Sequence, residues 1–253
     1  MLSLKSKLPE EYSIWALGHG GHDIPKDYPD YPKVSENPTL FNLEGTIQQK
    51  IDFVSQNISR DQELILVGHS IGAKMVLETM RANCANVKLA CLLFPTFENM
   101  ITSPAGKRLK YSVKYLPMIC QMILAWILSF LPQSLLKSLI RLWIGSSSPD
   151  GCVDASVDLI NPEVIRHILF LADTELQTVL DPDYELLNQV KDKLWLYYGS
   201  NDPWVPLEYH KNLVENVPGI HAEVCKHDIP HAFVLNQSCL VAEIVSKRIL
   251  DLE

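Results

Sequence analysis

The chain has 253 residues, a length that one α/β domain with an inserted segment can occupy. Hydrophobic residues make up 47% of the sequence and charged residues 21%, which is enough apolar material for a sizeable core and argues against long disordered regions. The formal net charge is −8, and the basic residues form no extended stripe, so the composition argues against nucleic-acid binding.

Six cysteines are spread along the chain, and none of them forms a C-x-x-C pair. Several lie in apolar runs, which is typical of buried thiols in a reducing compartment. Residues 1–9 contain Lys5 and Lys7 but no apolar stretch long enough to direct export, so we expect a protein that faces the cytosol. His167, His210 and His221 contain no pair with the spacing of a zinc site, and no glycine loop is suited to phosphate, so we expect neither a metal nor a cofactor.

Short apolar runs alternate with helical patterns along the chain, which predicts a mostly parallel sheet covered by helices on both faces. Residues 46–58 have helical spacing, and Thr46 with Gln49 fits a capping box at the start of that helix. A last helix is expected at about 238–250. The expected strands are Ile14–Leu17, Leu64–Val67, Leu89–Phe94, Leu194–Tyr198 and Ala222–Cys225.

The second expected strand runs into a G-x-S-x-G sequence from Gly68 to Gly72 and then into a helical pattern. In this setting the motif predicts a nucleophile elbow, a sharp turn that exposes the hydroxyl of Ser70. Side chains at positions 68 and 72 are expected to collide with the neighbouring helix and strand, which would explain both glycines. The backbone N–H of Ile71 is expected to point at the developing oxyanion, helped by the helix N-terminus.

A nucleophilic serine needs a base, and the base needs an acid that fixes its tautomer. Asp202 follows the fourth expected strand, and both His227 and His231 follow the fifth, in the chain order that this kind of site requires. We favour His231 as the base because the loop needs several residues beyond the strand to reach back over Ser70, and His227 is the alternative. His69 is expected to pack beside the elbow rather than to act.

Residues 103–182 break the alternation of strands and helices and are predicted to form a helical insertion. The insertion separates an N-terminal part of the core, residues 1–102, which carries the elbow, from a C-terminal part, residues 183–253, which carries the expected acid and base. Residues 118–131 are apolar nearly all round, a pattern typical of a helix that is buried or in lipid.

A helix that spans a membrane needs roughly 20 apolar residues, whereas Pro117 and Pro132 bracket only about 14 here. Basic residues on both flanks favour a hairpin or an in-plane helix whose ends stay on the cytosolic side of a lipid surface. A hydrophobic cap packed over the active site is the alternative. The residues expected at the lipid surface are Met118, Ile119, Met122, Ile123, Trp126, Ile127, Phe130, Leu131 and Trp143.

Several segments of the chain resemble the lipid droplet-associated hydrolases. They are Ile14–His22, Val67–Gly72, Leu92–Thr96, Tyr197–Gly199 with Asp202–Trp204, and Ile229–Phe233. The resemblance covers nearly the whole chain and implies the α/β-hydrolase fold, with Ser70, Asp202 and His231 as the catalytic triad. It also implies a cytosolic protein that is anchored to lipid droplets and endoplasmic reticulum by its apolar insertion. The substrates it implies are cholesteryl or other neutral-lipid esters.

The family pattern includes early strands and a proline- and glycine-rich loop that supplies a second oxyanion donor, before the strand that matches Ile14–Leu17. This sequence begins after that loop, which predicts a shortened form, and losing one such donor lowers kcat by roughly 10²–10³. The segment His19-Gly20-Gly21 looks like an H-G-G oxyanion motif. By this resemblance, however, it follows the strand that matches Ile14–Leu17, whereas the oxyanion loop precedes that strand. The sequence therefore predicts a serine hydrolase of lipid esters, with a catalytically weak or inactive lipid-droplet protein of the same fold as the alternative.

Overall fold

The computed structural model describes residues 2–24, 30–115, 118–145 and 148–252. These residues form two compact units, each assembled from separate stretches of the chain. The first unit consists of Met1–Phe41, Tyr115–Phe170 and Ala232–Glu253, and the second of Asn42–Lys114 and Leu171–His231. The three-part division at residues 102 and 182 stays a prediction.

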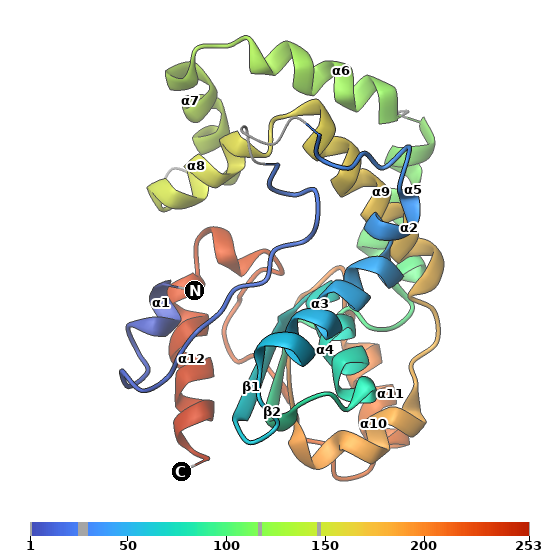
Figure 1. The fold of residues 1–253 in the computed structure, drawn as a ribbon, viewed down its shortest axis with the longest axis vertical. Helices are drawn as coiled ribbons and strands as arrows, with labels where there is room; N and C mark the ends of the chain where they lie inside the picture. Colours follow the sequence, from blue (N-terminus) through green and yellow to red (C-terminus); the bar gives the residue numbers. More distant parts are fainter. Residues whose placement is uncertain (1, 25–29, 116–117, 146–147, 253) are drawn as a thin grey trace. The chain divides into compact units, whose positions relative to one another are not determined.

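Helices follow one another between and beyond the strands (Figure 1). The α-helices are α1 (Leu2–Lys5), α2 (Pro38–Phe41), α3 (Leu43–Asn57), α4 (Ile71–Ala82), α5 (Pro104–Tyr115), α6 (Met118–Ser129), α7 (Gln133–Ile144), α8 (Asp150–Asp158), α9 (Pro162–Thr178), α10 (Tyr184–Val190), α11 (Leu207–Asn216) and α12 (Ser238–Leu250). Short 3₁₀ turns are η1 (Met100–Thr102), η2 (Lys191–Lys193) and η3 (Phe233–Leu235).

The second unit is built on a parallel sheet whose strands lie in the order β1-β2-β3-β4. Four of the five expected strands are confirmed to within a few residues, and they are β1 (Glu63–His69), β2 (Asn86–Leu93), β3 (Leu194–Tyr198) and β4 (Ala222–Val224). In the register, His69 pairs with Leu93 and Leu93 pairs with Tyr197. The carboxyl ends of these strands therefore lie level at one edge of the sheet.

The first expected strand, Ile14–Leu17, is wrong, because these residues form neither helix nor strand. A short apolar run becomes a strand only where a neighbouring strand supplies hydrogen bonds and a buried face. Here the side chain of Trp15 is 66% exposed and that of Leu17 is 37% exposed. Among the described residues β1 is thus an outer strand, and its Val67 is 42% exposed.

One face of the sheet packs on α4, α10 and α11 in a single apolar core. In α4 the core positions Ala73, Val76, Leu77 and Met80 follow the spacing of one helix face. The strands contribute alternate side chains to this core, as expected for one face of a sheet, except between Val87 and Ala90, where the register with β1 shifts. These strand residues are Val87, Ala90, Leu92, Leu194, Leu196 and Tyr198.

Helix α3 starts earlier than the capping box predicted. Its N-cap is Asn42, whose side-chain oxygen accepts a hydrogen bond from the N–H of Gly45 at 2.7 Å. Thr46 lies inside the helix with 1% of its surface exposed. Asparagine caps a helix about as well as threonine or better. The helix therefore starts at the cap that Asn42 provides, one turn before the expected cap at Thr46 with Gln49.

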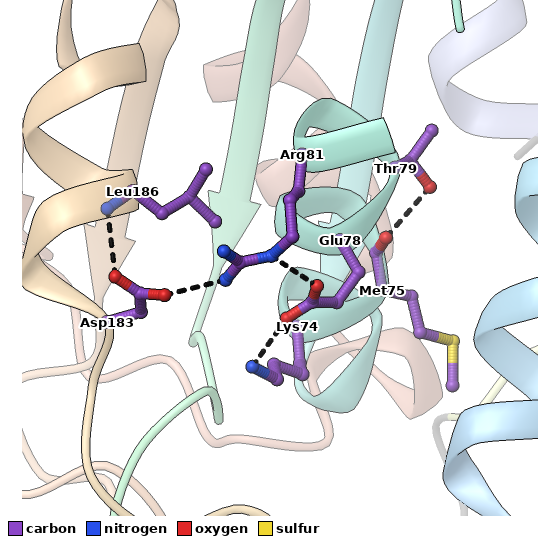
Figure 2. Close-up of polar contacts among 7 residues, drawn as sticks. All are labelled: Lys74, Met75, Glu78, Thr79, Arg81, Asp183 and Leu186. Atoms are coloured by element: carbon purple, nitrogen blue, oxygen red, sulfur yellow. Dashed lines mark hydrogen bonds and ion pairs between the residues drawn. The ribbon is translucent and has the colours of Figure 1, made fainter. Parts of the chain in front are cut away.

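The helix that follows the elbow, α4, is tied to α10 by charged side chains (Figure 2). Glu78 accepts hydrogen bonds from Lys74 at 2.7 Å and from Arg81 at 2.8 Å, and Arg81 also reaches Asp183 at 2.7 Å. Asp183 is the N-cap of α10 and accepts from the N–H of Leu186 at 2.9 Å. This backbone bond and the guanidinium of Arg81 hold the pKa of Asp183 below its ordinary value.

The first unit contains α1 beside α12, and α6, α7 and α8. Oγ of Ser3 in α1 lies 3.6 Å from Sγ of Cys239 in α12. The inner face of α7 packs on α8 and η3 through an apolar cluster, and the Sγ of Cys152 in α8 donates to the carbonyl oxygen of Val234 at 3.4 Å. The buried residues of the cluster are Leu136, Ile140, Ile144 and Val153.

The two glycines of the elbow have different reasons to be glycine. A Cβ at Gly68 would lie 2.4 Å from the backbone oxygen of Gly72, so position 68 requires glycine, as the sequence predicts. The same expectation is wrong for Gly72, because a Cβ there would meet no described heavy atom within 4 Å. A side chain at position 72 therefore points into open space.

We expect alanine at these two positions to have opposite effects on stability. Gly72→Ala should raise the free energy of unfolding by about 0.4–1 kcal/mol, because alanine restricts the unfolded chain and favours the helix. Gly68→Ala should lower it by roughly 1–3 kcal/mol, because the added methyl group overlaps backbone. Urea denaturation of both variants measures this difference, and a Gly68→Ala protein as stable as Gly72→Ala would contradict it.

Burial also sets the charge of Glu175 in α9, whose surface is only 8% exposed. Burial raises the pKa of this carboxyl group to about 8, so the folded protein holds a proton that the unfolded chain releases near the ordinary value of 4.5. Stability should therefore fall as the pH rises from about 4.5 to 8.

Glu175→Gln should flatten this pH dependence, because glutamine resembles the protonated acid. At pH 8.5 we expect the variant to be more stable than the parent by about 1–3 kcal/mol, and at pH 5 to be nearly equal to it. Denaturant unfolding at both pH values measures the difference. Glu215→Gln, an exposed glutamate in α11, is the control and should leave the slope unchanged. Parallel stability curves for Glu175→Gln and the parent would refute the prediction.

Candidate active site

Ser70 lies where β1 ends and α4 begins. Its backbone angles, φ 54° and ψ −124°, fall in a region that residues with a side chain rarely adopt, so the turn stores strain. The N–H of Ser70 donates to the carbonyl oxygen of Leu93 at 3.0 Å, and the N–H of Thr96 donates to the carbonyl oxygen of Ser70 at 3.2 Å. These bonds to the end of β2 and to the loop after it hold the strained residue in place.

His231 comes from the loop after β4 and contacts Ser70. The hydroxyl of Ser70 lies 2.8 Å from Nε2 of His231 and can donate its proton there. His227, the alternative base, is exposed in the same loop, and its carbonyl oxygen accepts from the Sγ of Cys225 at 3.0 Å and the Oγ of Ser200 at 3.3 Å. Of the two histidines, His231 is the one that the structure brings to Ser70.

Asp202 lies in the loop after β3 and completes the arrangement. Its Oδ2 accepts from Nδ1–H of His231 at 2.7 Å, and its side chain has no exposed surface. The other oxygen accepts from the N–H groups of Trp204 at 2.8 Å and Val205 at 3.3 Å. Both oxygens of this buried carboxylate are therefore occupied, and Nε2 of His231 is left as an acceptor facing Ser70.

Aromatic rings surround the imidazole of His231. Phe94 lies edge-on with ring centroids 6.2 Å apart, and Trp204 lies at 6.0 Å. Phe94 has φ 48°, which is rare for a bulky residue. Its ring also explains Gly199, because a Cβ there would lie 2.8 Å from Phe94. The imidazole thus sits in an apolar wall with 13% of its side chain exposed.

Two donors near Ser70 come from different elements. Ile71 is the first residue of α4, so its N–H has no acceptor within the helix. The hydroxyl of Thr96, in the loop after β2, lies 3.3 Å from Oγ of Ser70, and Thr96 is 2% exposed. Sequence reasoning missed Thr96, although its place at the end of a parallel strand puts it at the same sheet edge.

His69 makes a contact that the sequence analysis did not foresee. Its Nε2 lies 2.9 Å from the carbonyl oxygen of His231, and the two rings are 5.2 Å apart. A carbonyl oxygen only accepts, so Nε2 of His69 carries the proton. Burial, together with the neighbouring His231, lowers the pKa of His69 to about 4. His69 is therefore neutral at neutral pH, which fits the expectation that it is no second base.

Among the histidines away from Ser70, His167 packs in the apolar interior. His167 is 2% exposed in α9, and its ring lies edge-on to Phe41 at 4.2 Å. Gly21 has φ 80°, and a Cβ there would lie 2.2 Å from the His167 ring, so the His19-Gly20-Gly21 segment is shaped by this contact. Within the described ranges, no three His, Cys, Asp or Glu side chains are arranged to hold a metal ion.

The residues expected at a lipid surface lie on α6 and α7 in the first unit. Most of those described are exposed, with Phe130 at 69% and Trp143 at 83%, whereas Met122 and Leu131 are partly buried. The side chains of Met118 and Ile119 lie outside the described residues. Four further apolar side chains of α6 and α7 that were not expected at the surface are also exposed, and these are Leu124, Leu135, Leu139 and Leu142.

Helix α7 has apolar residues on two faces. Leu136, Ile140 and Ile144 face the cluster with α8, while the exposed stripe from Leu135 to Trp143 follows the spacing i, i+4, i+7 and i+8. The apolar arc of α7 is therefore wide enough to be shared between this cluster and the exposed stripe. Within the described part of the chain, the helices are too short or too polar to cross a membrane.

Comparison with known proteins places the chain in a family. The model of a family described as lipid-droplet associated hydrolase matches residues 1–234. A lipid droplet-associated hydrolase of Drosophila melanogaster is 34% identical over 237 residues, which cover 92% of this chain and 77% of the relative. The Gallus gallus protein of that name is 31% identical (96% and 77% covered) and the Homo sapiens protein 27% identical (98% and 78% covered).

Solved structures give the fold. A tomato methylketone synthase matches with a TM-score of 0.59 at 12% identity, over all of this chain and 93% of the other. A 2-hydroxy-6-oxo-6-phenylhexa-2,4-dienoate hydrolase from Rhodococcus matches with a TM-score of 0.57 at 14% identity, over 83% of this chain and 72% of the other. These likenesses confirm the α/β-hydrolase fold alone. With the family match over most of its length, the chain belongs to the lipid droplet-associated hydrolase family.

Proposed function

We propose that this chain is a serine hydrolase of lipid esters, with Ser70 as the nucleophile, His231 as the base and Asp202 as the acid. The contact that carries the proposal is the 2.8 Å approach of Ser70 Oγ to Nε2 of His231. The 2.7 Å bond from His231 to the buried Asp202 supports it, because it leaves Nε2 free to accept a proton. Membership of a hydrolase family supports the reaction class.

Attack of Ser70 Oγ on the ester carbonyl carbon forms a new C–O bond, while the hydroxyl proton moves to Nε2 of His231. The negative charge then sits on the former carbonyl oxygen, where the N–H of Ile71 at the start of α4 donates to it. His231 returns its proton to the leaving alkoxide oxygen as the ester C–O bond breaks. A water molecule then attacks the acyl carbonyl carbon and gives a proton to Nε2 of His231. His231 returns this proton to Ser70 Oγ as the bond between the acyl carbon and Oγ breaks and the carboxylic acid leaves.

Asp202 suits the role of acid because it needs no rearrangement when His231 becomes charged. Its side chain is fully buried, and the N–H groups of Trp204 and Val205 hold one oxygen. The other oxygen is thereby fixed toward Nδ1 of His231. A preorganised carboxylate of this kind stabilises the imidazolium through a short, charge-assisted hydrogen bond.

The exposed apolar side chains of α6 and α7 support a lipid surface as the partner. Leu142 is 85% exposed and Trp143 is 83% exposed, and neighbouring exposed apolar side chains of this kind mark interaction or membrane surfaces. We infer that these helices lie in the plane of a lipid droplet or endoplasmic reticulum surface on its cytosolic face. Cholesteryl or other neutral-lipid esters are the proposed substrates, and the support from the relatives is their printed association with lipid droplets.

Labelling with a fluorophosphonate probe tests the reaction, because the probe reacts with an activated serine hydroxyl. We expect the parent to label at Ser70 and Ser70→Ala not to label. Asp202→Asn should label about 10³–10⁴-fold more slowly, because the wrong tautomer of His231 is favoured. The control is Asp228→Asn, an exposed aspartate in the base loop, which should label like the parent. Equal labelling of parent and Ser70→Ala, or none of either, would leave only the non-catalytic lipid-surface alternative.

Flotation with emulsion droplets of triolein coated with phosphatidylcholine tests the lipid surface. Leu142→Ser with Trp143→Ser should lower the droplet-bound fraction at least about tenfold, because two large apolar side chains no longer leave water. Trp15→Ser, which removes an exposed tryptophan of the same unit outside α6 and α7, is the matched control and should float like the parent. Undiminished flotation of the double variant would favour the alternative, in which the insertion is a hydrophobic cap that does not contact lipid.

A further inference from the structure

The base comes from a long loop, and its position must be fixed by something more rigid. β4 has only three residues, and His231 lies seven positions after its last residue, Val224. His69, in contrast, is the last residue of β1 and pairs in the sheet with Leu93. The bond of 2.9 Å from Nε2–H of His69 to the carbonyl oxygen of His231 therefore joins the base residue itself to the sheet.

We propose that His69 is a positioning residue for the base, whose hydrogen bond to the backbone of His231 holds the imidazole over Ser70. The inference rests on the proposed function, because it assigns His69 a part in the attack by Ser70. Asp202 fixes the rotation of the imidazole through Nδ1, and His69 fixes the backbone from which that imidazole extends. Two anchors, one at the end of β1 and one in the loop after β3, locate the ring more tightly than either could alone.

A neutral imidazole is well suited to this place. The rings of His69 and His231 lie only 5.2 Å apart, so a positive side chain at position 69 would oppose the imidazolium that forms on His231. Burial keeps His69 neutral at neutral pH, since its pKa is lowered to about 4. The ring centroid of Phe94 lies 6.3 Å from that of His69 and 6.2 Å from that of His231. The space at position 69 therefore suits a flat ring that also carries a hydrogen-bond donor.

Substitutions at position 69 separate the donor from the ring. His69→Phe keeps a flat ring without the donor, and His69→Gln keeps an N–H donor at a similar reach. We expect His69→Phe to label with fluorophosphonate at least about tenfold more slowly, through the rate of inactivation rather than through probe binding. His69→Gln should stay within about threefold of the parent, because the hydrogen bond can reform.

His210→Phe provides a matched control. In the parent, Nε2 of His210 lies 3.3 Å from the backbone carbonyl oxygen of Ala222, and the His210 ring packs edge-on to Tyr198 in the same unit. This variant should lose stability to a degree comparable with His69→Phe while labelling like the parent. Labelling of His69→Phe at the parent rate would overturn the positioning role. A parent that labels no more than Ser70→Ala would instead refute the proposed function.

A second measurement covers the case in which His69→Phe is less stable. In a His231→Ala background, where no base remains to be positioned, His69→Phe should not lower the residual labelling rate further. An equal fold loss in both backgrounds would mean general loosening of the fold and would overturn the proposal. The parent should show a low-field proton NMR signal from His231 Nδ1–H. This signal should broaden or vanish in His69→Phe and persist in His69→Gln and His210→Phe.

Discussion

Parallel strands bring their carboxyl ends to one edge of a sheet, and the candidate site depends on this constraint. Because His69 pairs with Leu93, and Leu93 with Tyr197, the chain leaves β1, β2 and β3 at the same level. Each exit contributes one side chain, and these are Ser70 after β1, Thr96 after β2, Asp202 after β3 and His231 after β4. No long-range folding of loops is needed to gather the first three, and only His231 has to be carried back by its loop.

Burial alone does not decide what a carboxyl group does in this fold. Asp202 and Glu175 are both nearly inaccessible to water. Asp202 accepts bonds from two backbone N–H groups and from His231, so its negative charge is met by donors on both oxygens. For Glu175 the pKa rises to about 8 through burial, which favours the protonated form. The donors around a buried acid, rather than its depth, fit Asp202 to hold an imidazolium.

Features that depend on local pattern could be predicted from the sequence, and features that depend on a distant partner could not. The bounds of β3 follow from a continuous apolar run and those of α12 from helical periodicity. The order of Ser70, Asp202 and His231 follows from strand order. Ile14–Leu17 has the pattern of a strand but no neighbour in the described sheet. Likewise, the open space at Gly72 and the bond from His69 to the His231 backbone appear only once the loops are in place.

The two apolar stripes of α7 show the same limit and also bear on the proposed surface. The helical periodicity of the sequence does not distinguish Leu136 from Leu139. In the structure Leu136 is buried in the cluster with α8, whereas Leu139 is exposed. The basic residues of α7 are engaged within the first unit, where Lys137 pairs with Asp154 at 2.6 Å and Arg141 pairs with Asp150. Such exposed pairs add little stability, yet they neutralise the charge beside the apolar stripe. Contact of α7 with lipid would then depend on apolar area rather than on anionic head groups, which suits a surface that covers neutral lipid.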